Sequence, residues 1–526
     1  MGQSATLGRS LGAMGLIAGM GSLLLLPGGC GQAPDDDLAQ AGGELGWDHQ
    51  GAASAGRLAA PRLLAPLSTT VSVSQRPVFR WTAPHRGQVT VEVCGDRACS
   101  AVLTAFHTSR SFARPAQALP AGVVFWRVSD RVGRRTLRSA VWQLTIPARD
   151  SGRTGSWSAV PDFNGDGFGD LVVGAKVANH EVRIFPGGPT GVATTPAQVL
   201  SGPPGFGDEL GPAGDLDGDG FGDLAIWIGG PPAQVAVYRG GISGPSSPVI
   251  FAGPEADFLS QMRVVSAGDV DGDGYGDLLV GGGAFAQLFL GSASGVQTTP
   301  AQNLPSATPA SGTAPDARWP IGGADFNGDG FPDAVIDGTQ GSLLYQGDGQ
   351  TLVARPDIAA PAGFGALAGD FNGDGFADLA NYAVTTGGPA GPVTSFQAIA
   401  GEYAYQGVGD TNRDGRSDVL YMVSSLVGVR EAEHLYFGVE IPCLSNDCPS
   451  RVPLFVPGHQ NDGNPFFVTI AGGIGDVNGD GFADLAYGSP GAGAVYLFLG
   501  SPAGPPPDPS LTITAEQGFG FSLARM

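Results

Sequence analysis

Positive charge and histidine are both scarce in this 526-residue chain. It has 27 Lys and Arg against 49 Asp and Glu, a formal net charge of −22, and only six His. An acidic surface repels nucleic-acid phosphates at long range, so we expect no nucleic-acid partner for the larger part of the chain. Bound cations are expected instead.

Recognisable catalytic motifs are also missing. The sequence has no nucleophile elbow, phosphate-binding loop or HExxH motif. The histidines are scattered without metal-ligand spacing, at His49, His85, His107, His180, His434 and His459. We therefore expect a binding or scaffold protein and not an enzyme.

Long apolar runs are confined to the N-terminus. Arg9 precedes an apolar run over residues 11–26, and a short Pro-Gly-Gly stretch leads to Cys30, which predicts an export signal over residues 1–29. A permanent transmembrane helix is the less favoured alternative, because glycines interrupt the run and it is short for a bilayer. The segment resembles a bacterial lipobox, with Pro27 at the usual Leu position. We expect a lipid anchor at Cys30, facing the periplasm or the extracellular space.

The other four cysteines form two close pairs. Cys94 and Cys99 are separated by four residues, as are Cys443 and Cys448. Zinc binding by these cysteines is the alternative, but neither pair has the two-residue spacing of a zinc knuckle. We predict two disulfides that close loops, in an oxidising compartment.

The N-terminal part differs from the rest in charge and pattern. Residues 57–153 hold 15 Arg against 4 acidic residues. Residues 30–60 predict a flexible linker, and residues 61–148 alternate apolar and polar residues between Pro and Gly, which predicts strands. The pattern resembles a fibronectin type III or immunoglobulin-like β-sandwich. Its positive charge could bind anionic glycans or a membrane surface, or dock against the acidic part.

A nine-residue acidic motif, Asp-x-(Asp/Asn)-x-Asp-Gly-x-x-Asp, occurs seven times and dominates residues 154–526. The copies, which we call loops one to seven, begin at Asp162, Asp215, Asp269, Asp325, Asp370, Asp410 and Asp476. Successive starts lie 40 to 66 residues apart, a length suited to one four-stranded blade. The sequence therefore predicts an all-β fold: a seven-bladed calcium-binding β-propeller over residues 154–526, preceded by the β-sandwich.

The motif has the chemistry of a calcium loop. Ca²⁺ takes six to eight oxygen ligands, and a tight turn with Gly at position 6 can aim oxygens from positions 1, 3, 5 and 9 inward. We expect the position-7 residue to give its backbone carbonyl while its side chain packs between blades, and the position-9 Asp to give both oxygens. The predicted ligands of up to seven structural Ca²⁺ are Asp162, Asn164, Asp166, Phe168 and Asp170; Asp215, Asp217, Asp219, Phe221 and Asp223; Asp269, Asp271, Asp273, Tyr275 and Asp277; Asp325, Asn327, Asp329, Phe331 and Asp333; Asp370, Asn372, Asp374, Phe376 and Asp378; Asp410, Asn412, Asp414, Arg416 and Asp418; Asp476, Asn478, Asp480, Phe482 and Asp484.

Two observations qualify this interpretation. Asp-Gly and Asn-Gly turns are common in β proteins without metal, but carboxylates clustered seven times over would repel one another without a cation. Loop six has Arg413 at position 4 and Arg416 at position 7, so we expect weaker calcium binding there.

The loops, together with Phe206-Gly207, Phe364-Gly365 and Gly488-Ser489-Pro490, resemble the FG-GAP (VCBS) repeats of integrin α-subunit propellers and their bacterial relatives. The resemblance implies that the calcium loops lie on one face and stiffen the blades, while ligands meet other loops. It favours a surface adhesion or ligand-binding module for a protein or glycan. The alternatives are a scaffold of a cell-envelope complex and a divergent glycan-acting enzyme.

Two segments do not fit a simple sevenfold repeat. Residues 518–524 look like the strand before an eighth loop, and we expect them to pair in the first repeat. Residues 431–466 look like a long insert in the sixth repeat, a candidate binding loop or a surface decoration.

Overall fold

The computed structural model divides the chain into two compact units, Met1–Ser54 and Ala55–Met526. The described residues all lie in the second unit: 59–85, 87–153, 155–157, 161–175, 180–230, 232–254, 263–282, 285–306, 317–338, 341–358, 360, 366–380, 384–392, 394–396, 405–421, 433–438, 451–454 and 470–525. The predicted export signal, Cys30, Cys443 and Cys448 lie outside them. Every element described is a β-strand, and within these ranges no helix is long and apolar enough to cross a membrane.

The N-terminal strands form two sheets. The three-stranded sheet contains β1 (Leu63–Ala65), β3 (Phe79–Trp81) and β6 (Phe112–Ala113). The seven-stranded sheet contains β10 (Ser156–Trp157), β2 (Thr70–Ser72), β9 (Trp142–Ile146), β7 (Gly122–Val132), β4 (Val89–Cys94), β5 (Val102–Thr108) and β8 (Arg135–Arg138). The return of β10 to this sheet extends it past the predicted boundary at residue 148.

Large aromatic side chains fill the space between these strands. Trp81, Trp126 and Trp142 are almost fully buried, and the rings of Trp126 and Trp142 meet edge to face with centroids 5.9 Å apart. The alternation in β4, where Val89, Val91 and Val93 are buried, follows from the period of two in a strand. These residues form one core cluster separate from the repeats.

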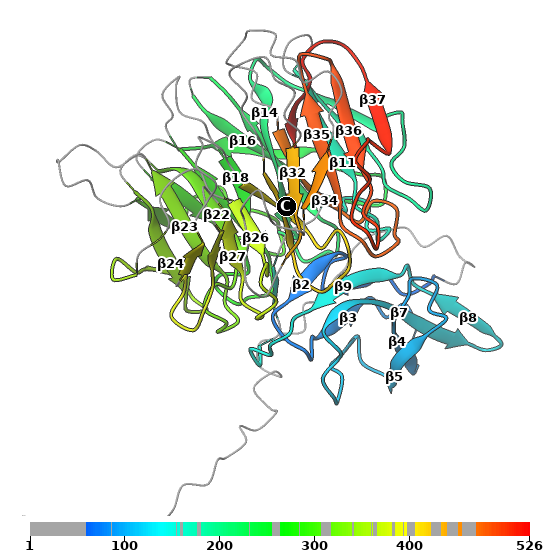
Figure 1. The fold of residues 1–526 in the computed structure, drawn as a ribbon. Helices are drawn as coiled ribbons and strands as arrows, with labels where there is room; N and C mark the ends of the chain where they lie inside the picture. Colours follow the sequence, from blue (N-terminus) through cyan, green and yellow to red (C-terminus); the bar gives the residue numbers. More distant parts are fainter. Residues whose placement is uncertain are drawn as a thin grey trace, which may run out of the picture. The chain divides into compact units, whose positions relative to one another are not determined.

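Seven sheets of four antiparallel strands follow (Figure 1). In sheet order they are β13 (Gln198–Ser201), β12 (Glu181–Phe185), β11 (Leu171–Ala175) and β38 (Phe519–Leu523); β14 (Phe206–Gly214), β15 (Asp223–Ile228), β16 (Gln234–Tyr238) and β17 (Pro248–Ala252); β18 (Arg263–Gly268), β19 (Asp277–Gly281), β20 (Ala286–Phe289) and β21 (Gln302–Leu304); β22 (Ala317–Ala324), β23 (Asp333–Gly338), β24 (Leu343–Gly347) and β25 (Leu352–Ala354); β26 (Ala366–Gly369), β27 (Asp378–Ala380), β28 (Val384–Thr386) and β29 (Thr394–Phe396); β30 (Tyr405–Gly409), β31 (Asp418–Tyr421), β32 (Glu433–Tyr436) and β33 (Arg451–Leu454); β34 (Ile470–Gly475), β35 (Asp484–Ser489), β36 (Ala494–Phe498) and β37 (Leu511–Thr514).

The C-terminal strand belongs to the first of these sheets. β38 pairs antiparallel with β11, with Leu523 opposite Val173, so the expected pairing of the terminal segment in the first repeat is confirmed. The end strands β14, β18, β22, β26, β30, β34 and β38 each contact the next, and β38 also contacts β14. One buried cluster combines residues of the first and last sheets, including Phe185, Phe519 and Leu497.

The predicted insert over residues 431–466 is wrong in part. β32 and β33 fall inside it and are the third and fourth strands of the sixth sheet. Their sequences, Glu-His-Leu-Tyr and Arg-Val-Pro-Leu, lack the apolar run that marks the third strand elsewhere. Residues 439–450 between them lie outside the described ranges.

Replacing Phe519 should test the contribution of β38. Its ring is fully buried beside Phe185, with centroids 6.1 Å apart, so Phe519→Ala should lower the free energy of unfolding by about 3–5 kcal/mol. Deleting Gln517 to Met526 should lower the melting temperature further. Thr512→Ala, at an exposed site on β37, is the control. Thermal melts that show no change for the deletion would contradict this assignment.

Candidate metal centre

Each acidic loop directly precedes the second strand of its repeat and has the same internal hydrogen bonds. In loop one the position-6 amide of Gly167 donates to Asp162 Oδ2 at 3.0 Å, and the position-7 amide of Phe168 donates to Asp166 Oδ1 at 3.0 Å. The first of these bonds recurs in all seven loops at 2.8–3.0 Å. The repeated sequence therefore folds into one repeated turn.

The position-9 aspartate joins three parts of each repeat. Asp170 accepts the Phe163 amide on Oδ2 at 3.0 Å and the Gly187 amide, which follows the third strand, on Oδ1 at 3.1 Å. Both bonds recur in every loop, at 2.7–3.0 Å and 2.8–3.1 Å. Both carboxylate oxygens thus already accept hydrogen bonds from backbone amides. Only their remaining lone pairs could coordinate a cation.

A glycine at or just after the end of each third strand has a structural reason that the sequence pattern did not reveal. A Cβ atom on it would collide with the position-8 carbonyl oxygen of its own loop. Only Gly brings the amide close enough to reach the position-9 carboxylate. The seven residues are Gly187, Gly240, Gly291, Gly347, Gly387, Gly438 and Gly500.

Backbone hydrogen bonds also link neighbouring loops. The position-8 amide of loop two, Gly222, donates to the Asp162 carbonyl of loop one at 3.1 Å. The same bond occurs in four further pairs, and Gly169 of loop one makes it to Asp476 of loop seven at 2.9 Å. Loop four lacks this donor because its position 8 is Pro332, which has no amide hydrogen.

Four position-7 rings, those of Phe168, Phe221, Tyr275 and Phe376, pack against the position-4 glycine of the neighbouring loop. The Phe221 ring of loop two lies over Gly165, the position-4 residue of loop one, where a Cβ atom would be 2.7 Å from the ring. Tyr275 covers Gly218 in the same way. Position-4 glycines have φ of 67–77°, and Arg413 of loop six adopts the same left-handed conformation with φ of 58°.

The position-9 aspartates are buried in all seven loops, and the position-1 aspartates are buried or half-buried, whereas most position-5 aspartates are exposed. Burial, reinforced by neighbouring carboxylates, raises the pKa of Asp162 to about 7; burial, opposed by two amide hydrogen bonds, raises the pKa of Asp277 to about 8. Among the described residues, Asp162 Oδ1 and Asp269 Oδ1 are buried without a hydrogen-bond partner. A hard dication would supply the missing charge.

Two loops bring three carboxylates together most closely. Oxygens of Asp215, Asp217 and Asp223 lie within 4.8 Å of one another, as do those of Asp269, Asp271 and Asp273. The donor set is all oxygen, which suits Ca²⁺ or Mg²⁺ better than softer metals. The residues of these loops therefore fit a structural cation.

The glycine requirement can be tested with two adjacent residues. Gly240→Ala should lower the free energy of unfolding by about 1–3 kcal/mol, because the new methyl group meets the Gly222 carbonyl. Gly241→Ala is the matched control, because its Cβ has only an ordinary 3.7 Å contact. Urea denaturation should separate the two variants, and equal stabilities would argue against the close approach.

The raised pKa values predict how the metal-free chain responds to pH. Asp277, with a pKa raised to about 8 in the folded state, binds protons more tightly there than in the unfolded chain. The folded state therefore holds more protons between about pH 4 and pH 8, so the free energy of unfolding should fall as pH rises. Thermal melts in chelator should show a higher melting temperature at pH 5 than at pH 8; the reverse order would contradict the burial of these groups.

Comparison with known proteins agrees with the repeat. Residues 154–192 and 468–498 match the FG-GAP repeat family, and residues 269–336 match the FG-GAP-like repeat family. The chain is 42% identical to integrin alpha-PS5 of Drosophila melanogaster over 106 residues, which are 18% of this chain and 10% of that protein. It is 34% identical to integrin alpha-IIb of Homo sapiens over 146 residues, 23% of this chain and 14% of that protein.

These relatives are matched over only a small share of their own length, 10% and 14%. Among solved structures, the Bacillus licheniformis rhamnogalacturonan lyase PL11 aligns with a TM-score of 0.36 at 13% identity, over 73% of this chain and 76% of that one. A likeness at that level supports no conclusion about fold or activity. The matched segments contain loops one, three, four and seven, so the chain carries FG-GAP repeats and is similar to integrin α-subunits over about a fifth of its length.

Proposed function

We propose that the chain is an exported, lipid-anchored and calcium-stabilised β-propeller that serves as a surface adhesion or ligand-binding module for a protein or glycan. The observation that carries this proposal is the sevenfold loop. All seven copies share one hydrogen-bonded turn; the position-9 aspartate is buried in every copy, and the position-1 aspartate is buried in loops one, four and seven and half-buried in the others. A repeated turn of this kind stiffens a scaffold and leaves other loops free for recognition.

In this proposal the seven four-stranded sheets are the blades of one closed propeller. The pairing of β38 with β11 and the contacts of β38 with β14 and β34 support closure. The two N-terminal sheets are then a fibronectin type III-like sandwich over residues 61–148, with β10 as an added strand. Closure through paired terminal strands removes exposed sheet edges.

Calcium would be held by the predicted ligands of each loop and would neutralise carboxylates that burial otherwise disfavours. Loop one offers Asp162, whose Oδ1 lacks a partner, together with Asn164 and Asp166. Loop six keeps its four predicted side-chain ligands despite Arg413 and Arg416. Their positive charge favours weaker calcium binding there.

Binding is favoured over catalysis because the repeated aspartates are already committed to the loops. The relatives described above are integrin α-subunits, and an integrin-like function is the basis for proposing a protein or glycan ligand. A scaffold role in a cell-envelope complex is the second candidate. The disulfide between Cys94 and Cys99 supports an oxidising compartment and hence export.

The function can be tested with the purified chain on glycan arrays and extracellular-protein panels, in calcium and in chelator. We expect saturable binding without turnover, and a sharply lower melting temperature after chelation, because a ligand that binds only the folded state stabilises it. Calcium affinity measured by titration calorimetry should accompany the melts.

Each outcome bears on one part of the proposal. Release of cleaved sugar would replace the binding function with a glycan-acting enzyme. Copurification with envelope proteins, together with no binding on the glycan arrays or protein panels, would favour the scaffold role. A melting temperature indifferent to calcium would remove the metal assignment.

A further inference from the structure

Arginines of the N-terminal region reach the acidic loops. We call residues 62–157 the cap. Arg62 donates a hydrogen bond to the backbone carbonyl of Asp219 in loop two, and its guanidinium lies 4.7 Å from the centroid of the Phe221 ring. This side chain therefore binds a carbonyl and an aromatic face of the loop at once.

Arg97 makes the most extensive of these contacts. It lies in the turn closed by the disulfide between Cys94 and Cys99. Its Nη2 donates to the Gly167 carbonyl of loop one at 2.8 Å, and its Nε donates to the Gly479 carbonyl of loop seven at 2.9 Å. The guanidinium also stacks on Phe168 at 4.3 Å. Arg97 thus joins the first and last repeats.

The end of the cap contacts two further loops. Arg153 lies 3.6 Å from the centroid of Phe331 and donates to the Asp329 carbonyl of loop four at 2.8 Å. Arg149 lies 4.4 Å from the centroid of Phe376 in loop five. Four cap arginines therefore contact five of the seven loops.

In loop six the arginine belongs to the loop and the carbonyl that it binds belongs to the cap. Arg413, the residue that breaks the motif at position 4, donates from Nη2 to the Gly95 carbonyl of the cap at 3.0 Å. Its guanidinium lies 5.7 Å from Phe125. The presence of Arg413 in place of the position-4 glycine, which has no explanation within the loop, is explained by this contact.

The arginines approach mainly carbonyls and ring faces. Within the described residues, the cap arginine that forms an ion pair with a loop carboxylate is Arg97, whose Nη2 lies 3.7 Å from Asp476 Oδ2. Side-chain oxygens of the loops therefore stay available to a cation. The carbonyls that the arginines bind belong to positions 4, 5 and 6, whose orientation depends on the folded turn.

We propose that the cap docks preferentially on cation-loaded loops, so that calcium binding and cap docking strengthen each other. The inference rests on the proposed function in that calcium occupies the loops. A cation fixes the turn that presents the carbonyls to the arginines, and docked arginines hold the same turn for the cation. Loss of calcium then releases the cap.

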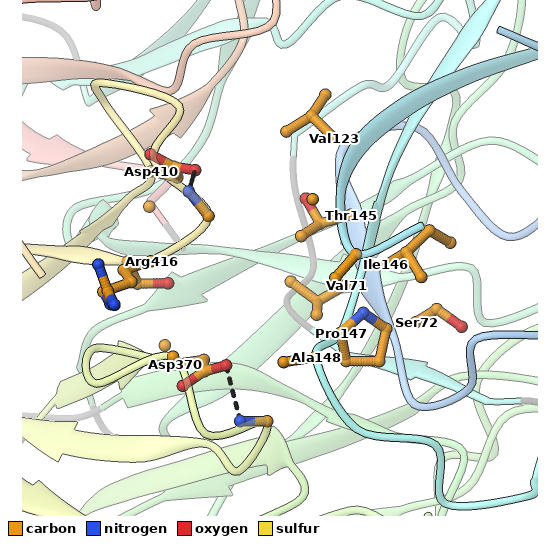
Figure 2. A pocket seen from close by; sticks show the side chains of 18 of the residues that line it. Val71, Ser72, Val123, Thr145, Ile146, Pro147, Ala148, Asp370, Asp410 and Arg416 are labelled. Carbon is orange, nitrogen blue, oxygen red and sulfur yellow. Dashed lines mark hydrogen bonds between the residues drawn. The ribbon is translucent and has the colours of Figure 1, made fainter. Parts of the chain in front are cut away.

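The cap and the repeats also line a partly open cavity of about 300 Å³. Figure 2 shows Val71, Val123 and Ile146 of the cap facing Asp370 and Asp410 of loops five and six across it. One wall is therefore largely apolar and the other carries carboxylates. Release of the cap would remove the apolar wall of this cavity.

The direction in which an arginine substitution changes calcium affinity distinguishes coupling from simple charge effects. Removing a positive charge beside a cation site should strengthen calcium binding if Coulomb repulsion is the only effect. Coupling predicts the opposite: the calcium concentration for half-maximal thermal stabilisation should rise several-fold in the double variant Arg97→Ala, Arg153→Ala. Arg135→Ala, exposed on β8, is the control.

A pair of glycine variants gives a second test. Gly167 and Gly274 both lie at position 6 with φ of 94°, so Ala is equally strained at both. A Cβ on Gly167 would lie 2.5 Å from the Val141 carbonyl of the cap, whereas a Cβ on Gly274 meets nothing within 4 Å. Gly167→Ala should therefore weaken cap docking, and Gly274→Ala should leave it intact.

Hydrogen exchange of the full wild-type chain measures docking without any substitution. The cap carries no predicted calcium ligand, so slower exchange in residues 94–99 on adding calcium would report docking. Calcium stabilisation together with unchanged exchange in the cap, or with equal or tighter calcium binding in the arginine variant, would overturn the coupling and leave the proposed function standing. No calcium effect on the melt would overturn both.

Discussion

Seven sets of buried carboxylates impose the main constraint on this chain. An aspartate that is taken out of water must be protonated, hydrogen-bonded or paired with a cation. The position-9 residues use two backbone amides each, and this choice fixes where the third strand ends and why a glycine follows it. The position-1 residues are satisfied less completely, as the unpartnered Oδ1 of Asp162 shows. Strand spacing and the demand for a cation thus arise from the same motif.

Neighbouring repeats depend on one another through these loops. Backbone bonds run from loop to loop, and in four loops the position-7 ring covers the position-4 glycine of the neighbouring loop. A change in one turn is therefore passed to its neighbour by direct contact. In solenoid and propeller repeats such nearest-neighbour interfaces supply much of the stability. The bond from Gly169 to Asp476 carries this dependence between the first and last repeats.

Much of this arrangement could be predicted from the sequence, because the motif repeats seven times and its turn is local. The all-β class, the position of each loop and the packing of Phe221 against the preceding loop followed from periodicity and residue type. The role of Gly187 could not be predicted, because its donor bond joins residues that are 17 positions apart. β32 was missed because its four residues lack an apolar run. Arg97 gave no local signal beyond the positive charge of its region, since its partners lie in loops one and seven.

The arginines of the cap show why charge totals are a poor guide to contact chemistry. A basic cap beside acidic loops suggests ion pairs, which would compete with a cation for the same oxygens. The contacts of Arg62 and Arg153 instead use loop carbonyls and aromatic faces. Guanidinium groups are suited to this because they are planar, weakly hydrated and carry several donors. A positively charged cap can therefore lie on a cation-binding face without displacing the cation, which a lysine-rich surface would do less well.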